Sequence, residues 1–152
     1  MLKKYLIFFL LMNILQGCGF TPIYSSNNNV GFHVKEINLE GDWETNIFIK
    51  NSILEGSSSS SKNSFKLNIT TNYLKNSVTK NSKGNTTSYE IIVESKFTVT
   101  FDNSNKIFLI KEKFIMENFT DKLEEKRFEK IVKENLANII VNKFKIKLNQ
   151  GI

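Results

Sequence analysis

The stretch that decides the fold is YEIIVESKFTVTFDNSNKIFLIKEKFIM, which runs from Tyr89 to Met116. From Tyr89 to Phe101, apolar side chains occupy alternate positions and face away from charged and hydroxyl side chains. This period of two is typical of a strand with one buried face. The polar segment 102–105 predicts a hairpin loop, after which a second strand returns.

The returning strand has one apolar face, which carries Phe108, Ile110, Phe114 and Met116. Its opposite face mixes apolar and basic side chains, namely Ile107, Leu109, Lys111, Lys113 and Ile115. The hairpin therefore predicts the centre and one side of an antiparallel sheet.

Two more strands are predicted upstream of this hairpin. Residues 65–73 alternate strictly and predict a half-buried strand. Another begins at Phe32, and its alternation slips by one residue before Ile37, which a β-bulge would explain. The serine-rich segment 55–64 predicts a flexible loop, and 75–87 predicts a long polar connection with a turn at its glycine.

A helix is predicted between the first two strands. Asp42 is a suitable N-cap, and Gly56 a plausible C-cap just after Leu54. This helix is apolar on two sides: one side carries Trp43, Ile47 and Leu54, the other Ile49 and Ile53. The sheet would cover one side and a partner or loops the other, unless residues 45–54 are partly strand.

The last helix follows a cap at Thr120 and Asp121, with Glu124 placed for a capping box. Its apolar side chains form an i+4 ladder of Phe128, Val132, Leu136, Ile140, Phe144 and Leu148. Such a ladder drifts about 40° per step around the helix. We expect its early part, with Ile131 and Ile139, to cover the sheet. Its later part would face a partner or belong to a frayed end.

The predicted order is β-α-β-β-β-α. This is the α+β class, a two-layer sandwich of two helices packed on a four-stranded, mainly antiparallel sheet.

The beginning of the chain predicts a targeting segment. Met1 to Lys4 form a basic head, and Tyr5 to Leu15 form an apolar run of about eleven residues. A membrane-spanning helix needs about 20 residues. We therefore interpret 1–17 as a signal peptide.

The single cysteine, Cys18, ends the tetrad LQGC, which has the spacing of a bacterial lipobox. A thiol is a good nucleophile for forming a thioether with diacylglycerol, and the amine freed by cleavage can be acylated as well. The sequence thus predicts S-diacylglycerol and an N-acyl chain such as palmitate on Cys18. Residues 18–29 would form the lipidated tether, and 30–152 the periplasmic domain.

The remaining composition restricts the function. The formal charge of the whole chain is +6, and loss of Lys3 and Lys4 with the signal peptide (6 − 2) leaves +4. This mild excess suits an anionic surface without selecting nucleic acid over acidic lipid. With one histidine, no cluster of metal-ligand spacing and no glycine-rich phosphate loop, we expect neither an enzyme nor a metal or organic cofactor.

The stretch CGFTPIY resembles the start of the mature chain in the LPS-assembly lipoprotein LptE family, which reads Cys-Gly-Phe-x-Pro-Leu-Tyr. The matching residues are Cys18, Gly19, Phe20, Pro22 and Tyr24, while Ile23 replaces the usual leucine. By resemblance to bacterial lipoproteins, the absence of aspartate after the cysteine favours the outer membrane.

The family resemblance implies a lipoprotein on the periplasmic side of the outer membrane. It implies that the chain plugs the LptD β-barrel, assists its assembly, and contacts lipopolysaccharide on its way to the outer leaflet. Nucleic acid is not an expected partner. Since lipopolysaccharide is anionic, exposed lysines are candidate ligands if they are not simply solvated. They are Lys66, Lys75, Lys80, Lys83 and Lys96.

A second hypothesis remains open from the sequence. The chain could be another outer-membrane lipoprotein, such as a pilotin-like factor for a secretin, or a free-standing lipid-binding module. The two hypotheses differ in the partner that each predicts.

Overall fold

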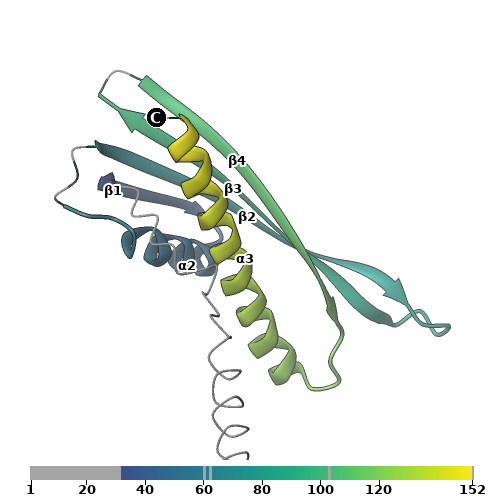
Figure 1. Ribbon diagram of the computed structural model, residues 1–152. Helices are drawn as coiled ribbons and strands as arrows, with labels where there is room; N and C mark the ends of the chain where they lie inside the picture. The colour runs from purple at the N-terminus through teal and green to yellow at the C-terminus, as the bar shows by residue number, and fades with distance from the viewer. Residues whose placement is uncertain (1–31, 60, 62, 103, 152) are drawn as a thin grey trace, which may run out of the picture.

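The computed structural model describes residues 32–59, 61, 63–102 and 104–151 (Figure 1). The predicted signal peptide, Cys18 and the rest of the N-terminal family motif lie outside these residues. The elements are β1 (Phe32–Gly41), α2 (Trp43–Leu54), β2 (Asn63–Lys80), β3 (Thr86–Phe101), β4 (Ser104–Glu117) and α3 (Lys122–Gly151). This order and the α+β class confirm the prediction.

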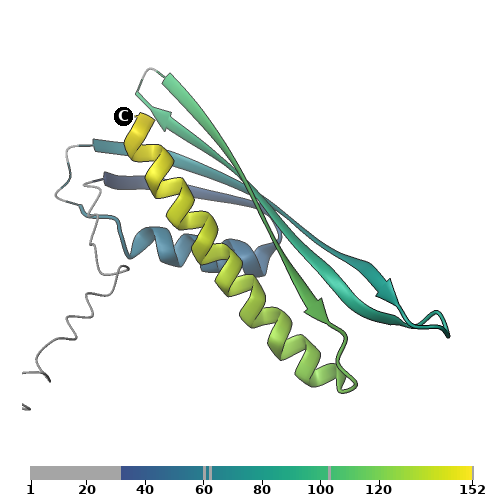
Figure 2. The same ribbon diagram turned by 45° about the vertical axis from the view of Figure 1, so that its right-hand side comes forward.

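The four strands form one sheet in the order β1-β2-β3-β4. The pairs β2–β3 and β3–β4 are antiparallel, whereas β1 and β2 are parallel. A parallel pair needs a crossover connection, and α2 provides it. Both helices lie on the same face of the sheet, which leaves the opposite face open (Figures 1 and 2).

Two local predictions for the start of the domain are confirmed. The register between β1 and β2 shifts between Val34 and Glu36, which is the bulge that the slip in alternation indicates. Asp42 caps α2, because its carboxylate accepts a hydrogen bond from the backbone N–H of Thr45 at 2.9 Å. Gly41 makes the turn before this cap with a φ of 90°.

The predicted two-sided helix is confirmed for α2, so the alternative of a partial strand is wrong. Ile49 and Ile53 are fully buried, whereas Trp43 and Leu54 are exposed. The predicted C-cap is wrong in detail, since Glu55 and not Gly56 is the cap residue. A Cβ on Gly56 would lie 3.0 Å from the ammonium nitrogen of Lys145, so the flexible lysine side chain would have to shift slightly to admit it.

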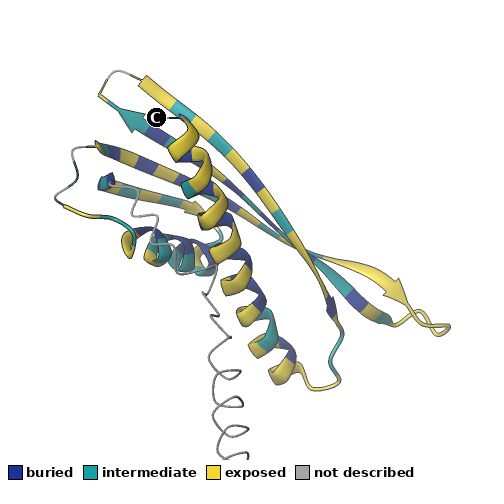
Figure 3. Ribbon diagram, in the orientation of Figure 1, coloured by how far each residue is buried: buried dark blue, intermediate teal, exposed yellow. Residues whose placement is uncertain are grey.

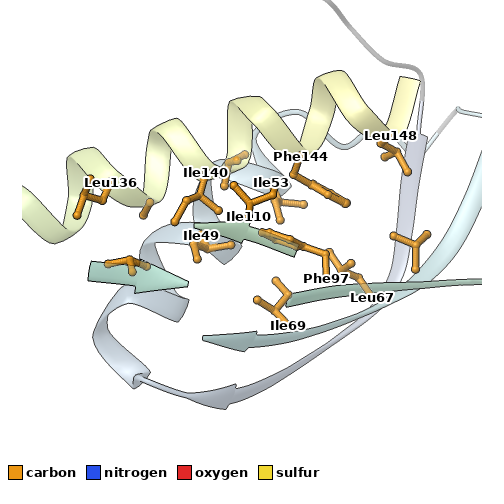
Figure 4. Packing of buried hydrophobic residues seen from close by; sticks show 14 of the residues in the cluster. Ile49, Ile53, Leu67, Ile69, Phe97, Ile110, Leu136, Ile140, Phe144 and Leu148 are labelled. Carbon is orange, nitrogen blue, oxygen red and sulfur yellow. The ribbon is translucent and has the colours of Figure 1, made fainter. Parts of the chain in front are cut away.

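The core lies between the inner face of the sheet and the two helices (Figure 4). Phe97 on β3 and Phe144 on α3 stack with ring centroids 4.3 Å apart and an interplanar angle of 13°. Phe108 on β4 meets the ring of Phe144 edge-on at 5.7 Å. Aromatic pairs of this kind stabilise a core beyond the area they bury.

The prediction for α3 is confirmed for the early ladder, where Val132 and Leu136 are buried, but it is wrong for Ile131 and Ile139 and for the later ladder. Ile131 and Ile139 are exposed, while Phe144 and Leu148 are fully buried. The helix contacts α2, β3 and β4 along its length. Because the ladder drifts around the helix, it follows the change of neighbour from Phe128 beside β4 to Phe144 over the sheet centre. The drift keeps the ladder buried to its end.

The predicted long connection at 75–87 is also wrong, because β2 continues to Lys80 and β3 begins at Thr86. Their end portions form a hairpin arm, defined here as residues 75–88, whose turn end projects beyond the helices (Figures 1 and 2). Hydroxyl pairs join the two strands across the arm, such as Ser77 with Thr86 at 2.8 Å. Serine, threonine and asparagine on both faces give no alternation, and the sequence pattern therefore indicated a loop.

Two predicted loops are shorter than expected, because the serine and asparagine residues at these strand ends also give no alternating pattern. The serine-rich loop gives way to β2 at Asn63, and β4 already begins at Ser104. At the other end of β4, Asp121 caps α3, since its carboxylate accepts a hydrogen bond from the backbone N–H of Leu123 at 2.7 Å.

Candidate functional site

The five candidate lysines do not converge on one site. Lys66 and Lys96 lie on the open face of the sheet, out of phase with the buried residues of β2 and β3. Lys66 pairs with Thr100 and Lys96 with Thr70, so the two lysines are four residues apart along the strands. This offset corresponds to roughly 13 Å. Lys75, Lys80 and Lys83 belong to the hairpin arm.

Lys66 stands beside a small cavity at the end of the sheet. The cavity has a volume of about 200 Å³ and is lined by Lys35, Phe65, Lys66, Thr100, Phe101 and Asp102. The ammonium of Lys66 lies 2.8 Å from Glu36, and that of Lys35 lies 3.7 Å from Asp102. The hydrogen bond to Glu36 raises the pKa of Lys66. An anion entering this cavity would compete with carboxylates already in place.

The expectation that Lys75 lies in an exposed connection is wrong. Its ammonium lies between the carboxylates of Glu125 and Glu129 on α3, 2.7 Å from each. Lys75 has the same parity as Phe65 and Tyr73, so it continues the inward-facing phase of β2. Continuing the alternation of inward-facing residues along β2 as far as position 75 would have predicted that Lys75 lies under the helix.

Lys75 belongs to a polar network between the arm and α3. Tyr73 donates a hydrogen bond to Glu129, and Lys122 donates one to Glu125 at 2.6 Å. Burial and the bond to Glu129 raise the pKa of Tyr73 above its ordinary value. The bonds from Lys122 and Lys75 lower the pKa of Glu125. At neutral pH the carboxylates are therefore ionised and the phenol is protonated.

The network continues to the start of α2. Lys133 lies 4.1 Å from the ring centroid of Tyr73, 3.0 Å from Glu44 and 3.6 Å from Asp42. A cation over an aromatic face is attracted to it, and the two carboxylates balance the charge. The result is an alternation of charges that joins both helices to β2. We assign it a structural role.

The tip of the hairpin arm is an exposed cationic part of the domain. Residues 75–89 include three lysines and no Asp or Glu. The side chain of Asn81 holds the turn, since its oxygen accepts hydrogen bonds from the backbone N–H of Lys83 and of Asn85, both at 3.0 Å. Among the described residues, no carboxylate lies within 4.0 Å of the ammonium of Lys80 or Lys83. Both can meet an external anion without breaking an ion pair.

Large apolar side chains are exposed on three separate surfaces. Figure 3 colours the ribbon by burial and shows exposed positions along α3 and β4. The outer side of α2 carries Trp43 and Leu54, as the sequence predicts. The open face of the sheet carries Leu74, Ile107, Leu109 and Ile115. The outer side of α3 carries Leu123, Ile131, Ile139 and Ile146, which the sequence did not reveal because the drifting ladder hides which positions face outward.

Two further properties concern only the part of the chain that the structure describes. Neither described helix combines the length and hydropathy needed to cross a bilayer. No three His, Cys, Asp or Glu side chains in the described ranges are grouped so as to hold a metal ion.

No protein-family model matches this sequence, and no curated protein matches it. Among solved structures, the rare lipoprotein B from Shewanella oneidensis is similar, with a TM-score of 0.52 and 14% identity, covering 77% of this chain and 99% of that chain. A minor lipoprotein from Acinetobacter baumannii matches with a TM-score of 0.48 and 16% identity, covering 74% of this chain and 94% of that one. The first likeness shows a shared fold.

Proposed function

We propose that this chain is a lipoprotein of the LptE type that is anchored to the outer membrane and faces the periplasm. In this proposal it plugs the LptD β-barrel, assists the assembly of that barrel and promotes the insertion of lipopolysaccharide into the outer leaflet. The lipobox at Cys18, the motif that follows it and the fold shared with a known lipoprotein support the proposal.

The anchor is the first element of the proposal. Cys18 would carry S-diacylglycerol and an N-acyl chain, and several acyl chains together hold a protein durably at a membrane. Residues 18–31 would then separate the anchor from Phe32, the first residue of β1. This arrangement would keep the domain next to the membrane.

The observation that carries the proposal is the exposure of apolar side chains on three sides of one small domain. Trp43, Ile115 and Ile139 represent these three surfaces. Exposed apolar patches mark interaction surfaces, and a single flat interface would need only one. A surrounding partner such as a barrel wall covers several sides at once.

Lipopolysaccharide phosphates would be met first by Lys80 and Lys83 at the tip of the arm. Charged hydrogen bonds to phosphate are stronger than neutral ones, and these lysines give up no ion pair to form them. Lys66 and Lys96 on the open sheet face are secondary candidates. Lys75 is the weakest of the five candidates, because Glu125 and Glu129 already bind its ammonium.

The test is depletion of this protein in its own cells, followed by measurement of surface lipopolysaccharide and of the folded state of the barrel. We expect less lipopolysaccharide at the surface and a misassembled barrel, and the wild-type gene should restore both. A Cys18→Ser gene should restore them poorly. Normal surface lipopolysaccharide with a normally folded barrel after depletion would refute the proposal.

The lysine assignment has its own matched control. Lys80→Glu with Lys83→Glu should complement poorly for lipopolysaccharide while leaving the barrel assembled. Lys126→Glu with Lys130→Glu makes the same charge change on exposed positions of α3, and it should complement normally. Equal behaviour of the two double variants would remove the arm tip from the proposal.

A further inference from the structure

The two edges of the sheet are built differently. β1 has 10 residues and is interrupted by a bulge. Its outer backbone is also occupied, since Phe32 accepts a hydrogen bond from the N–H of Ser58 at 2.9 Å and Val34 donates one to the hydroxyl of Ser57 at 3.2 Å. Bulges and covering loops are devices that protect a sheet edge from further pairing.

β4 lacks both devices. It has 14 residues, and its register with β3 runs without a shift from Ser88 opposite Glu117 to Phe101 opposite Ser104. Within the described residues β4 pairs with β3 alone. In an antiparallel sheet alternate residues direct their N–H and C=O groups away from the paired neighbour. β4 therefore presents a continuous row of such groups at the side of the sheet.

The helix beside β4 does not cover this edge from the open face. Contacts from α3 reach side chains on the inner face of β4: Lys143 bonds Glu112, and Phe128 lies beside Phe114. On the open face, Ile107 is 66% exposed, Leu109 58% and Ile115 52%. A long uncovered edge with exposed apolar side chains is a template for another strand.

The open face of β4 also carries basic side chains that favour an acidic partner. Along the strand it presents two apolar side chains, then Lys111 and Lys113, then Ile115. The ammonium of Lys113 lies 3.0 Å from Glu90 and that of Lys111 lies 4.0 Å from Glu94, both on β3. Both lysine side chains remain more than half exposed, so their other side is open to acidic groups on a further strand.

We propose that β4 accepts an extended segment of another protein as the fifth strand of this sheet. That segment is acidic opposite Lys111 and Lys113 and apolar opposite Ile107, Leu109 and Ile115. Backbone hydrogen bonds supply affinity in such strand addition, and the alternating side chains supply specificity. The inference goes beyond the proposed function, because it depends on the edge of this chain and not on the identity of the barrel.

A second copy of this chain does not fit the same edge. Two antiparallel registers would pair nearly the whole strand with its copy and keep open-face side chains together. In one register Lys111 lies opposite its own copy. In the other, Leu109 lies opposite Lys111 of the copy and Ile107 opposite Lys113 of the copy. Like charges placed directly opposite destabilise the first register. In the second register each lysine faces an apolar side chain of the copy instead of a carboxylate, so a strand with acidic side chains at these positions fits the edge better than a second copy.

The test uses the full chain in mild detergent with the synthetic peptide Val-Thr-Glu-Thr-Glu-Thr-Val-Thr-Val as the probe. In the antiparallel direction its side chains match the open face of β4 from Ile115 to Ile107. We expect the peptide at about 1 mM to protect backbone amides of β4 from hydrogen exchange and to leave β1 unchanged. N-methylation of alternate peptide nitrogens should abolish the protection, because it removes the donors.

Charge exchange provides the matched control. A peptide with lysine in place of both glutamates should bind at least about five-fold more weakly, and the double variant Lys111→Glu with Lys113→Glu should reverse this preference. Should that variant fold poorly by circular dichroism, Lys111→Gln with Lys113→Gln should bind the two peptides equally. The proposal is overturned if β4 amides gain no protection, if β1 is protected instead, or if the wild-type chain binds both peptides equally.

Discussion

The ammonium nitrogen of Lys75 lies 2.7 Å from a carboxylate oxygen of Glu129, although the two residues are 54 positions apart. This contact joins the hairpin arm to the first turns of α3. A second contact of the same length joins Lys75 to Glu125 one helical turn earlier. The arm and the helix are therefore held together by charge at the end of the hydrophobic core, next to Ile91, the buried partner of Lys75 in the sheet.

We expect Lys75→Met to destabilise the fold. The substitution leaves Glu125 and Glu129 without their shared cation, and removal of one partner from a mostly buried pair costs about 2–4 kcal/mol. The measurement is the free energy of unfolding from urea titration. Lys111→Met is the control, because its pair is long and exposed and should contribute within about 0.5 kcal/mol. Equal losses would mean that the network adds nothing.

The same network predicts how stability depends on pH. Hydrogen bonds from Lys122 and Lys75 hold the pKa of Glu125 below its ordinary value of 4.5. Burial opposes the same change at Glu129, but hydrogen bonds from Lys75 and Tyr73 outweigh it and lower the pKa of that carboxyl too. Below pH 4.5 the unfolded chain therefore binds more protons than the folded one, so the free energy of unfolding decreases as the pH is lowered. Since the pKa of Tyr73 is raised above 10.0, stability also falls above pH 10.

Urea midpoints measured across this pH range should give a plateau with two falling sides. Glu129→Gln should flatten the acid side without removing it, because Glu125 and Asp42 also have lowered pKa values. An acid side that keeps its full slope in Glu129→Gln would argue against this carboxylate as a source of acid sensitivity.

The corrected packing of α3 predicts a large effect near its end. Phe144→Ala should lower the free energy of unfolding by about 3–5 kcal/mol, since it removes the ring stacked on Phe97. Ile146→Ala, two residues away on the exposed side, should change it by less than about 0.5 kcal/mol. Similar small effects for both would indicate that the end of the helix frays.

Substitutions at two glycines with positive φ allow the energetic cost of a steric clash to be compared with the cost of backbone strain alone. A Cβ on Gly41 would lie 2.0 Å from the carbonyl oxygen of Thr71, which itself accepts a hydrogen bond from Asp42 N–H at 2.8 Å. Gly41→Ala should therefore cost more than about 3 kcal/mol. Gly84→Ala has open space and should cost about 1 kcal/mol from strain alone. Thermal unfolding of both variants would check the difference.

Alternation and capping residues are enough to predict most of the fold. The core strands around Phe97, the bulge before Ile37 and the cap at Asp42 each have a local pattern that only one structure explains. The hairpin arm has no such pattern, because paired hydroxyl and amide side chains resemble those of a loop. The burial of Phe144 depends on where α3 crosses the sheet, and no local pattern contains that information.

The candidate site was predictable only in part. The tip lysines Lys80 and Lys83 are exposed as expected, but the sequence alone suggested the same for Lys75, which binds two carboxylates of a distant helix. Long-range ion pairs depend on tertiary packing and leave no mark at their own positions. The exposed isoleucines of α3 were missed because the buried ladder also consists of aliphatic residues.

The central claim is that this chain is the lipoprotein plug of a lipopolysaccharide-exporting barrel. The most direct test is purification of the tagged full-length protein from its own outer membranes after gentle solubilisation, with identification of what accompanies it. We predict a large LptD-like barrel in stoichiometric amount. Recovery of a secretin, or of no barrel at all, would contradict the claim.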